Sequence, residues 1–230
     1  MTKMNPLSRI LRYGSARLGL GRLHRETEAC REDSRQLVKT TFQYADGFFA
    51  PIQVEDEIVK LVDDVRKLEP KRVVEIGTSM GGTLYLWTRL AQADATIISA
   101  DLPGGKFGGG YSPLRTPLYQ SFARAQQKLH LLRVNSHEKA TLEQVKQLLG
   151  GEPIDFLFID GDHTYEGVKQ DWEMYSPLVR PGGLVAFHDI AMNYDDTQVK
   201  RFWDELTPNV RHREYAYHPK GFYGIGVVEV

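Results

Sequence analysis

Cysteine is almost absent from this sequence, because Cys30 is the only one among 230 residues. A single cysteine cannot form an internal disulfide, so a disulfide-stapled fold is excluded and a reducing compartment is expected. Long apolar runs are absent too, since no stretch approaches the roughly 20 residues of a membrane-spanning helix. The amino terminus also lacks the continuous apolar segment of a secretory signal. We therefore expect a cytoplasmic globular protein with no transmembrane segment.

The sequence has no excess of charge of either sign. Lys and Arg number 29, Asp and Glu number 30, and the formal net charge is -1. Nucleic-acid binders normally depend on a basic surface that displaces counterions, so nucleic acid is not an expected partner. Hydrophobic residues make up 41% of the chain. That content and length suit one large domain with a full core.

Residues 1–50 differ from the rest of the chain. From Lys3 to Arg25 there are six Lys or Arg residues, and the first acid is Glu26. Leucine and isoleucine recur at loosely helical spacing, but three glycines between residues 14 and 21 weaken a helix. We predict an N-terminal helical extension, docked or frayed. A basic amphipathic anchor, a lid and a contact in a homo-oligomer are the alternatives.

Residues 51–230 alternate between strand-like and helix-like patterns, which predicts a single α/β domain. Strands are expected over 72–76, 96–100, 130–134, 154–159 and 183–188, and helices over 54–68, 81–92, 116–127, 138–149, 164–175 and 196–206. No helix separates the last two strand-like runs, 211–217 and 223–230, so they predict a hairpin with an antiparallel strand. The expected fold is a Rossmann-like, doubly wound, mostly parallel seven-stranded sheet.

The first strand ends without the G-x-G-x-x-G spacing of dinucleotide-binding folds. Glu75 instead precedes the turn Gly77-Thr78-Ser79-Met80-Gly81-Gly82. A carboxylate there suits an ammonium group, and the backbone N–H groups at the next helix start suit a carboxylate. An amino acid moiety carries both charges. A tight turn that binds nothing is the alternative.

The second strand is followed by Asp101, which could accept hydrogen bonds from both hydroxyls of a ribose. A solvated loop acid or a helix cap is the alternative. The glycine-rich segment 104–110 comes next and is either a lid over the site or a mobile surface loop. With the missing second domain, these features favour S-adenosylmethionine over NAD as the nucleoside cofactor.

Acids and histidines follow two further strands. Asp160-Gly161-Asp162-His163 comes after the strand at 154–159, and His188-Asp189 after the strand at 183–188. Parallel strands end at the same sheet edge, so these side chains are expected to meet, and clustered Asp oxygens suit a hard cation such as Mg²⁺. Alternatively, Asp162 or Thr164 simply caps the next helix.

Together these motifs resemble class I S-adenosylmethionine-dependent methyltransferases. The resemblance rests on Glu75–Gly82, Asp101, Phe158-Ile159-Asp160-Gly161-Asp162-His163-Thr164-Tyr165-Glu166 and Pro181-Gly182-Gly183…Phe187-His188-Asp189. It is closer to small-molecule O-methyltransferases, including the group that contains cephalosporin hydroxylases and sugar O-methyltransferases of antibiotic pathways. It covers about residues 50–230.

The resemblance implies a role for each residue by position. The methionine part of the cofactor would contact Glu75, Gly77, Thr78, Ser79 and Gly81. Its ribose would contact Asp101, and its adenine would contact Ser136 and His137. Asp160 is a further expected cofactor contact. The cation would be held by Asp160, His188 and Asp189. His163 stands where catechol-type enzymes have a catalytic lysine, so it is the expected general base. His188 replaces the usual acid and Asp189 a frequent Asn, so Mn²⁺ or Fe²⁺ could substitute for Mg²⁺, or His188 could act in proton transfer without a metal.

The predicted function is O-methylation of a small hydroxylated metabolite, as in natural product biosynthesis, with the assistance of a divalent cation. A metal-independent O- or N-methyltransferase is the nearest alternative. An iron-dependent hydroxylase could use His163, His188 and one aspartate, and a non-catalytic cofactor-binding module is the last alternative. Tyr111, Tyr194 and Trp203 are candidates for lining the acceptor pocket.

Overall fold

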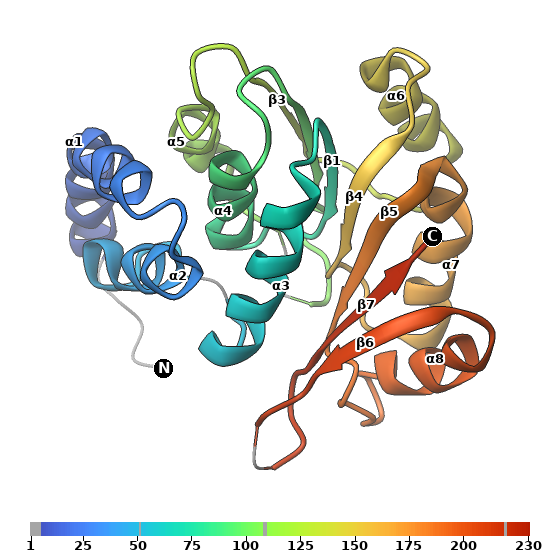
Figure 1. Ribbon diagram of the computed structural model, residues 1–230. Helices are drawn as coiled ribbons and strands as arrows, with labels where there is room; N and C mark the ends of the chain where they lie inside the picture. The colour runs from blue at the N-terminus through green and yellow to red at the C-terminus, as the bar shows by residue number, and fades with distance from the viewer. Residues whose placement is uncertain (1–5, 51, 108–109, 219) are drawn as a thin grey trace.

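The computed structural model describes residues 6–50, 52–107, 110–218 and 220–230, with side chains from Tyr13 onward. These residues form a sheet of seven strands in the order β3-β2-β1-β4-β5-β7-β6 (Figure 1). The strands are β1 Arg72–Ile76, β2 Thr96–Ala100, β3 Lys128–Leu132, β4 Ile154–Ile159, β5 Val179–His188, β6 Arg211–Tyr215 and β7 Ile225–Glu229. Strands β1 to β5 pair in parallel, and β7 pairs antiparallel with both β5 and β6. The predicted mostly parallel sheet with a C-terminal antiparallel hairpin is confirmed.

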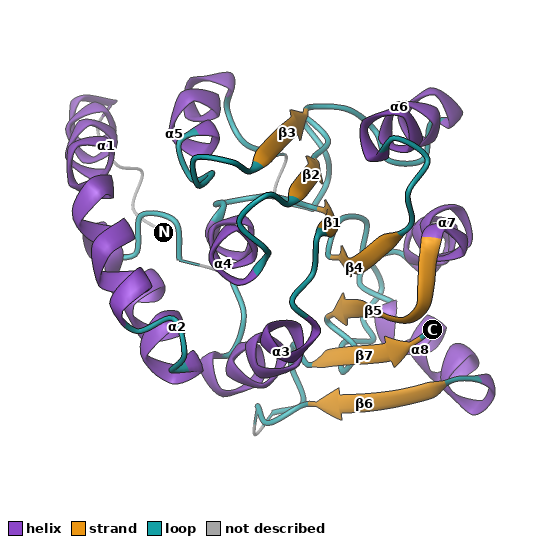
Figure 2. Ribbon diagram, turned by 45° about the horizontal axis from the view of Figure 1, so that its top comes forward, coloured by secondary structure: helices purple, strands orange, loops and turns teal. Residues whose placement is uncertain are grey.

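Helices cover both faces of this sheet (Figure 2). They are α1 Pro6–Ala29, α2 Ser34–Gln43, α3 Glu55–Leu68, α4 Gly82–Leu90, α5 Thr116–Gln120, α6 Lys139–Leu149, α7 Tyr165–Tyr175 and α8 Val199–Leu206. Figure 2 shows α3, α4 and α5 on one face and α6, α7 and α8 on the other. Because side chains alternate along a strand, Val73 joins the core under the first face and Val74 the core under the second. Burial on both faces explains the nearly continuous apolar runs of the central strands.

The N-terminal extension is a docked pair of helices. Helix α1 is continuous through its three glycines. A Cβ at Gly19 would lie 2.6 Å from the Tyr44 hydroxyl oxygen, and that hydroxyl donates to the Ala16 carbonyl at 2.6 Å. Thr27 Oγ1 also lies 2.9 Å from Tyr85 Oη of α4. Glycine at position 19 is therefore explained by close packing, despite its poor helix propensity.

Parts of two predictions for this region lie outside the described residues, namely Lys3 of the basic arm and the domain boundary at Pro51. Within the described chain, no helix is long and apolar enough to cross a membrane. The division into 1–50 and 51–230 stays a prediction.

The structure departs from the sequence pattern mainly after α5. A helix is expected over 116–127, but α5 ends at Gln120. Beyond it, Ser121 Oγ donates to the Leu118 carbonyl, and Gln127 Nε2 donates to the carbonyls of Thr88 and Gln92. These side-chain bonds to backbone groups hold an irregular turn in place of a helix. Strand β3 accordingly begins two residues before the expected position.

The strand order places the site. Strand β1 lies between β2 and β4, so the chain leaves β1 toward one edge of the sheet and later returns on the other side. In open α/β sheets, ligands bind at the carboxyl ends of the strands at such a switch point. The Glu75 turn, Asp101 and the Asp160 segment all follow these strands.

Candidate active site

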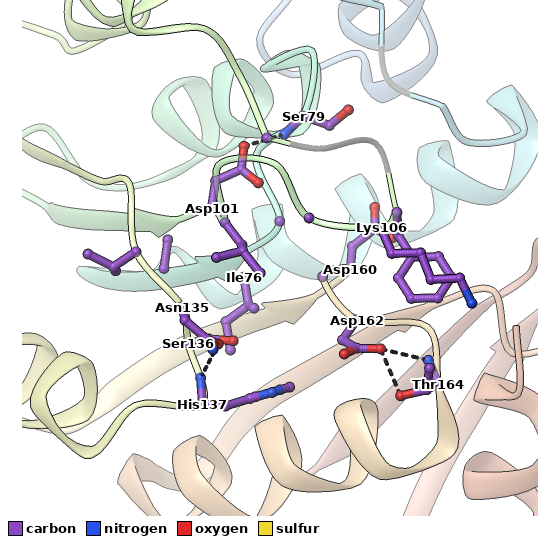
Figure 3. Close-up of a pocket in the computed structure, with 18 residues that line it drawn as sticks. Ile76, Ser79, Asp101, Lys106, Asn135, Ser136, His137, Asp160, Asp162 and Thr164 are labelled. Carbon is purple, nitrogen blue, oxygen red and sulfur yellow. Dashed lines mark hydrogen bonds between the residues drawn. The ribbon is translucent and has the colours of Figure 1, made fainter. Parts of the chain in front are cut away.

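A cavity of about 210 Å³ opens at the switch point (Figure 3). Among the predicted cofactor residues, those that line it are Gly77, Ser79, Asp101, Ser136, His137 and Asp160. Figure 3 shows Ser79 and Asp101 at one end and His137 with Asp162 at the other. The carboxyl ends of β1, β2, β3 and β4 thus contribute to one space.

Gly77 forms the floor of this cavity where β1 and β4 end side by side. Its φ is +94°, and a Cβ built on it would collide with the Asp160 carbonyl oxygen. The Gly77 N–H donates to the Ala100 carbonyl at 2.8 Å, and the Asp160 N–H donates to the Ile76 carbonyl at 2.8 Å. No side chain fits at this crossing, so the turn needs glycine and leaves bare backbone facing the cavity.

Glu75 lies behind the cavity wall. Its side chain is fully buried, and it accepts hydrogen bonds from Trp87 Nε1 at 2.9 Å and Ser99 Oγ at 2.6 Å. Burial raises the pKa of Glu75 to about 8, although these two bonds oppose the rise. Thr78 is buried with its hydroxyl bonded to Ser99, and Gly81 packs against the Tyr119 ring. These three predicted cofactor residues shape the wall and do not line the cavity.

Asp101 connects the turn after β1 to the segment after the glycine-rich loop. Its Oδ2 accepts the backbone N–H groups of Ser79 at 3.2 Å and Tyr111 at 3.1 Å. Burial raises the pKa of Asp101, and these bonds oppose the rise. Ser79 has a φ of +44°, which is unusual for a residue with a side chain and occurs here at the cavity edge. Asp101 therefore organises the turn as well as facing the cavity.

His137 has a partner that the sequence did not reveal. Its Nε2 lies 3.2 Å from Oδ1 of Asp171, a fully buried residue of α7. The nearby carboxylate of Asp171 raises the pKa of His137 against the effect of burial, and burial raises the pKa of Asp171 itself. The sequence did contain one indication of this pair, because Asp171 is a charged residue at a buried position of α7.

The ends of β4 and β5 bring two carboxylates and two imidazoles together. Asp160, His163 and Asp189 each offer a ligand atom within 4.8 Å of the others. His163 Nε2 lies 3.5 Å from Asp160 Oδ1, and His163 Nδ1 lies 3.1 Å from Asp189 Oδ2. His188 Nδ1 lies 3.1 Å from Asp160 Oδ1 and 3.3 Å from Asp189 Oδ1. All four predicted residues meet, and the geometry groups His163 with the two acids.

The electrostatics of this cluster favour the protonated, positively charged forms of its two imidazoles. Burial works to raise the pKa of Asp160, but the charges and hydrogen bonds of His188 and His163 outweigh it and lower that pKa. Burial lowers the pKa of His188, yet the two aspartates raise it to about 9. The pKa of His163 is raised in the same way, against burial. Burial also raises the pKa of Asp189, against the effect of His188.

The donor set of this cluster fits a divalent cation. His188 Nε2 is buried and has no hydrogen-bond partner among the described residues. Asp189 Oδ1 is buried too and, although it lies 3.3 Å from His188 Nδ1, it forms no hydrogen bond within the described chain. Two carboxylate oxygens and an imidazole nitrogen are suitable ligands for Mg²⁺, Mn²⁺ or Fe²⁺. A cation binds to the deprotonated forms of such ligands and so supplies the charge that imidazole protons supply otherwise.

The start of α3 contributes two polar residues that no motif in the sequence indicated. Gln53 Nε2 donates to Asp160 Oδ2 at 2.9 Å. Glu57 is fully buried and accepts the backbone N–H groups of Tyr217 at 2.6 Å, His218 at 3.2 Å and Gly224 at 3.1 Å. Glu57 thereby anchors the ends of the β6–β7 connection.

Aromatic rings stack on both histidines of the cluster. The Phe107 ring lies 4.8 Å from the His163 ring at 16°, and the Tyr223 ring lies 5.9 Å from the His188 ring at 20°. Phe107 also lines the cavity, whereas residues 108–109 of the predicted lid lie outside the described residues. Of the three candidates for the acceptor pocket, Tyr111 and Trp203 are core residues and Tyr194 is 47% exposed.

Comparisons with known proteins bear on the family and the fold of this chain. The Methyltransf_24 family model, described as a methyltransferase domain, matches residues 74–190. The chain is 27% identical over 168 residues to Uncharacterized protein y4gI of Sinorhizobium fredii, covering 71% of this chain. It is 29% identical over 153 residues to Uncharacterized protein R132 of Acanthamoeba polyphaga mimivirus, covering 66% of this chain. The match spans 18% of the first relative and 66% of the second.

Solved structures share the fold at low identity. The O-methyltransferase TomG from Streptomyces achromogenes, in complex with SAM, has a TM-score of 0.55 at 16% identity, covering 86% of this chain and 89% of that one. An O-methyltransferase from Bacillus cereus in complex with SAH has a TM-score of 0.54 at 16% identity, covering 88% of this chain and 91% of that one. The MycE methyltransferase of mycinamycin biosynthesis, in complex with Mg and SAH, has a TM-score of 0.50 at 17% identity, covering 74% of this chain and 47% of that one. The chain therefore belongs to the methyltransferase domain family and has the class I fold of S-adenosylmethionine-dependent methyltransferases.

Proposed function

We propose that this methyltransferase transfers a methyl group from S-adenosylmethionine to a hydroxyl oxygen of a small metabolite, with a divalent cation bound at Asp160, His163 and Asp189. One observation carries the proposal. Asp160 belongs both to the wall of the cavity and to the acid–histidine cluster. A nucleoside in the cavity would therefore lie next to a hydroxyl bound at the cluster.

The cavity offers a partner for each part of the cofactor. Asp101 would accept the ribose hydroxyls, and Ser136 with His137 lines the end proposed for adenine. The bare backbone of Gly77 and the N–H groups at the start of α4 are proposed to receive the methionine part. Glu75 would act on that part through Ser99 and Thr78, because its carboxylate is already bonded behind the wall.

Oxygen is the proposed acceptor atom. TomG and the Bacillus cereus protein are O-methyltransferases and bind SAM and SAH, respectively, which supports the choice of cofactor and acceptor. The cofactor supplies an electrophilic methyl carbon, so the protein mainly has to align the attacking oxygen. A divalent cation held by Asp160, His163 and Asp189 would lower the pKa of a hydroxyl bound to it. A neighbour with the same fold, MycE, is in complex with Mg and SAH.

His188 is the proposed acceptor of the hydroxyl proton. Its Nδ1 faces Asp160 and Asp189, and its buried Nε2 has no partner among the described residues. A base whose second nitrogen is oriented by carboxylates is a common arrangement in general base catalysis. The sequence suggested His163 as base and His188 as ligand, with proton transfer by His188 as the alternative without a metal. The distances support His188 as the base and His163 as the ligand. The two carboxylates raise the pKa of His188 to about 9, and a cation that offset their charge would lower it.

The proposal is tested with purified protein, labelled S-adenosylmethionine and a panel of phenols, catechols and sugars, before and after exhaustive chelation. We expect methylated oxygen in at least one acceptor, loss of activity on chelation and recovery with Mg²⁺ or Mn²⁺. Activity that survives chelation identifies a metal-independent enzyme instead.

Three further results would each contradict the proposal in a different way. Methylated nitrogen would identify an N-methyltransferase, and a requirement for oxygen and a reductant would identify a hydroxylase. SAH binding without turnover of any acceptor would identify a non-catalytic cofactor-binding module. A cytoplasmic location, a role in natural product biosynthesis and homo-oligomer formation through residues 1–50 stay predictions.

A further inference from the structure

A polar side chain just before α3 reaches the candidate cation site. Gln53 Nε2 donates to Oδ2 of Asp160 at 2.9 Å. The other carboxylate oxygen, Oδ1, lies 3.5 Å from His163 Nε2 and 3.1 Å from His188 Nδ1. Asp160 thus has one oxygen held by Gln53 and the other facing the cluster. The hydrogen bond from Gln53 therefore fixes the orientation of the Asp160 carboxylate, with Oδ1 toward the two histidines.

The other polar atom of the Gln53 amide, Oε1, is unpaired in the described part of the chain. Gln53 Oε1 is buried, and it has no hydrogen-bond partner among the residues that the structure describes. Leaving a buried acceptor without a donor destabilises a fold, so such an atom calls for an explanation by an absent ligand. A hydrated divalent cation brings donors with it, because it keeps bound water molecules.

We propose that Gln53 is a positioning residue of the cation site. Its Nε2 fixes the carboxylate of Asp160, and its Oε1 accepts a hydrogen bond from water bound to the cation. This inference rests on the proposed function, because it needs a cation held by Asp160, His163 and Asp189. Side chains that orient metal ligands typically contribute about 10–100-fold to metal affinity.

The test measures binding of Mn²⁺ alone to the full chain by calorimetry. Gln53→Met keeps the length of the side chain but removes the amide, and we expect Mn²⁺ to bind about 10–100-fold more weakly. Gln53→Asn keeps the amide on a side chain too short to reach Asp160, and it should weaken Mn²⁺ binding as well. Gln36→Met is the matched control, because the side chain of exposed Gln36 on α2 bonds Thr40, away from the site. Affinity for SAH should be the same in all four proteins.

The outcomes separate this inference from the proposed function. Equal Mn²⁺ affinity in wild type and a folded Gln53→Met variant overturns the role of Gln53 and leaves the cation site standing. If that variant does not fold, equal affinity in Gln53→Asn overturns the role in the same way. A wild type that binds no Mn²⁺ overturns the cation site and this role together. Weaker Mn²⁺ binding with unchanged SAH binding supports the role, because general damage to the fold would weaken both.

Discussion

The two halves of the site are built on opposite principles. In the cofactor half, at the ends of β1 and β2, the buried acids are bonded to donors of the protein itself. Glu75 is bonded by Trp87 and Ser99, and Asp101 by two backbone N–H groups. In the other half, at the ends of β4 and β5, two carboxylates face two imidazoles and buried atoms are left without partners among the described residues. We call these the cofactor half and the cation half.

The difference indicates how each half would respond to its ligand. A bonded network keeps its shape when empty, so the cofactor half offers a preformed wall for a nucleoside. A cluster of partly unsatisfied charges changes its protonation when a cation arrives. A substitution that affects one half only would therefore separate binding of the cofactor from binding of the cation.

The largest expected effect is in the cation half, at Asp189. Asp189→Asn keeps the shape of the side chain, and asparagine tolerates the φ of +63° at this position. A residue that only orients a metal ligand contributes up to about 100-fold to metal affinity. Because Asp189→Asn removes the charge of a ligand itself, we expect Mn²⁺ affinity and turnover to fall by more than that. SAH affinity should not change, since Asp189 does not line the cavity. Calorimetry with each ligand checks this, with exposed Asp195→Asn as control, and undiminished Mn²⁺ binding would remove Asp189 from the ligand set.

The second effect is the converse, at Asp101. Asp101→Asn should weaken SAH binding by about 10–100-fold, because charge-assisted hydrogen bonds contribute roughly 1.5–3 kcal/mol. Mn²⁺ affinity should stay at the wild-type value. Asp94→Asn is the control, since Asp94 is an exposed acid beside β2 that pairs with Lys71 at 2.7 Å. Normal SAH affinity in Asp101→Asn would contradict the ribose role, and a loss of Mn²⁺ binding would show that the halves are not independent.

Glu57 gives a smaller effect that is confined to the cation half. Glu57→Gln replaces a carboxylate that accepts three backbone N–H groups, so we expect the free energy of unfolding to fall by about 1–3 kcal/mol. The amides of Tyr217, His218 and Gly224 should exchange faster with solvent, while SAH affinity is unchanged. Urea unfolding and hydrogen exchange measure both. Asp56→Asn, on the exposed side of the same helix turn, should change stability little, and equal losses in the two variants would count against an anchoring role.

The smallest effect concerns a titration outside these two halves, in the cavity wall that follows β3. His137 should titrate above its ordinary pKa of about 6.5, because Asp171 favours its protonated form. In Asp171→Asn that influence is lost while burial remains, and burial disfavours the charged imidazole, so the pKa of His137 should fall. NMR titration of the His137 ring in both proteins gives the answer directly. An unchanged pKa would mean that Asp171 does not control this wall of the cavity.

Much of this fold could be predicted because its strands are buried on both faces. Runs such as Phe156-Leu157-Phe158-Ile159 predict buried strands, and the acids that follow them were expected at one sheet edge. The turn after α5 could not be predicted in this way, because Gln127 bonds backbone groups of Thr88 and Gln92 that are distant in the sequence.

Two of the missed residues share one property. Gln53 and Glu57 are far along the chain from the groups that they bind, with a sequence separation of 107 from Gln53 to Asp160 and of 167 from Glu57 to Gly224. Spacing in the sequence carries no information about such contacts. A weaker signal was present, since Glu57 occupies a core-facing position beside Ile58 and Leu61 in the apolar pattern of α3. A charged residue at such a position needs a buried partner.

The anchoring of the β6–β7 connection by Glu57 has a practical consequence. The bonds from Tyr217, His218 and Gly224 come from main-chain nitrogens. The first two bonds do not depend on the side chains of Tyr217 and His218, whereas residue 224 has a φ of +88° and should stay glycine. Side chains such as that of Phe222 can therefore be randomised in a directed-evolution library without detaching the segment from its carboxylate. The protein thus offers a replaceable surface next to the proposed reaction centre, which is a useful starting point for engineering new acceptor preferences.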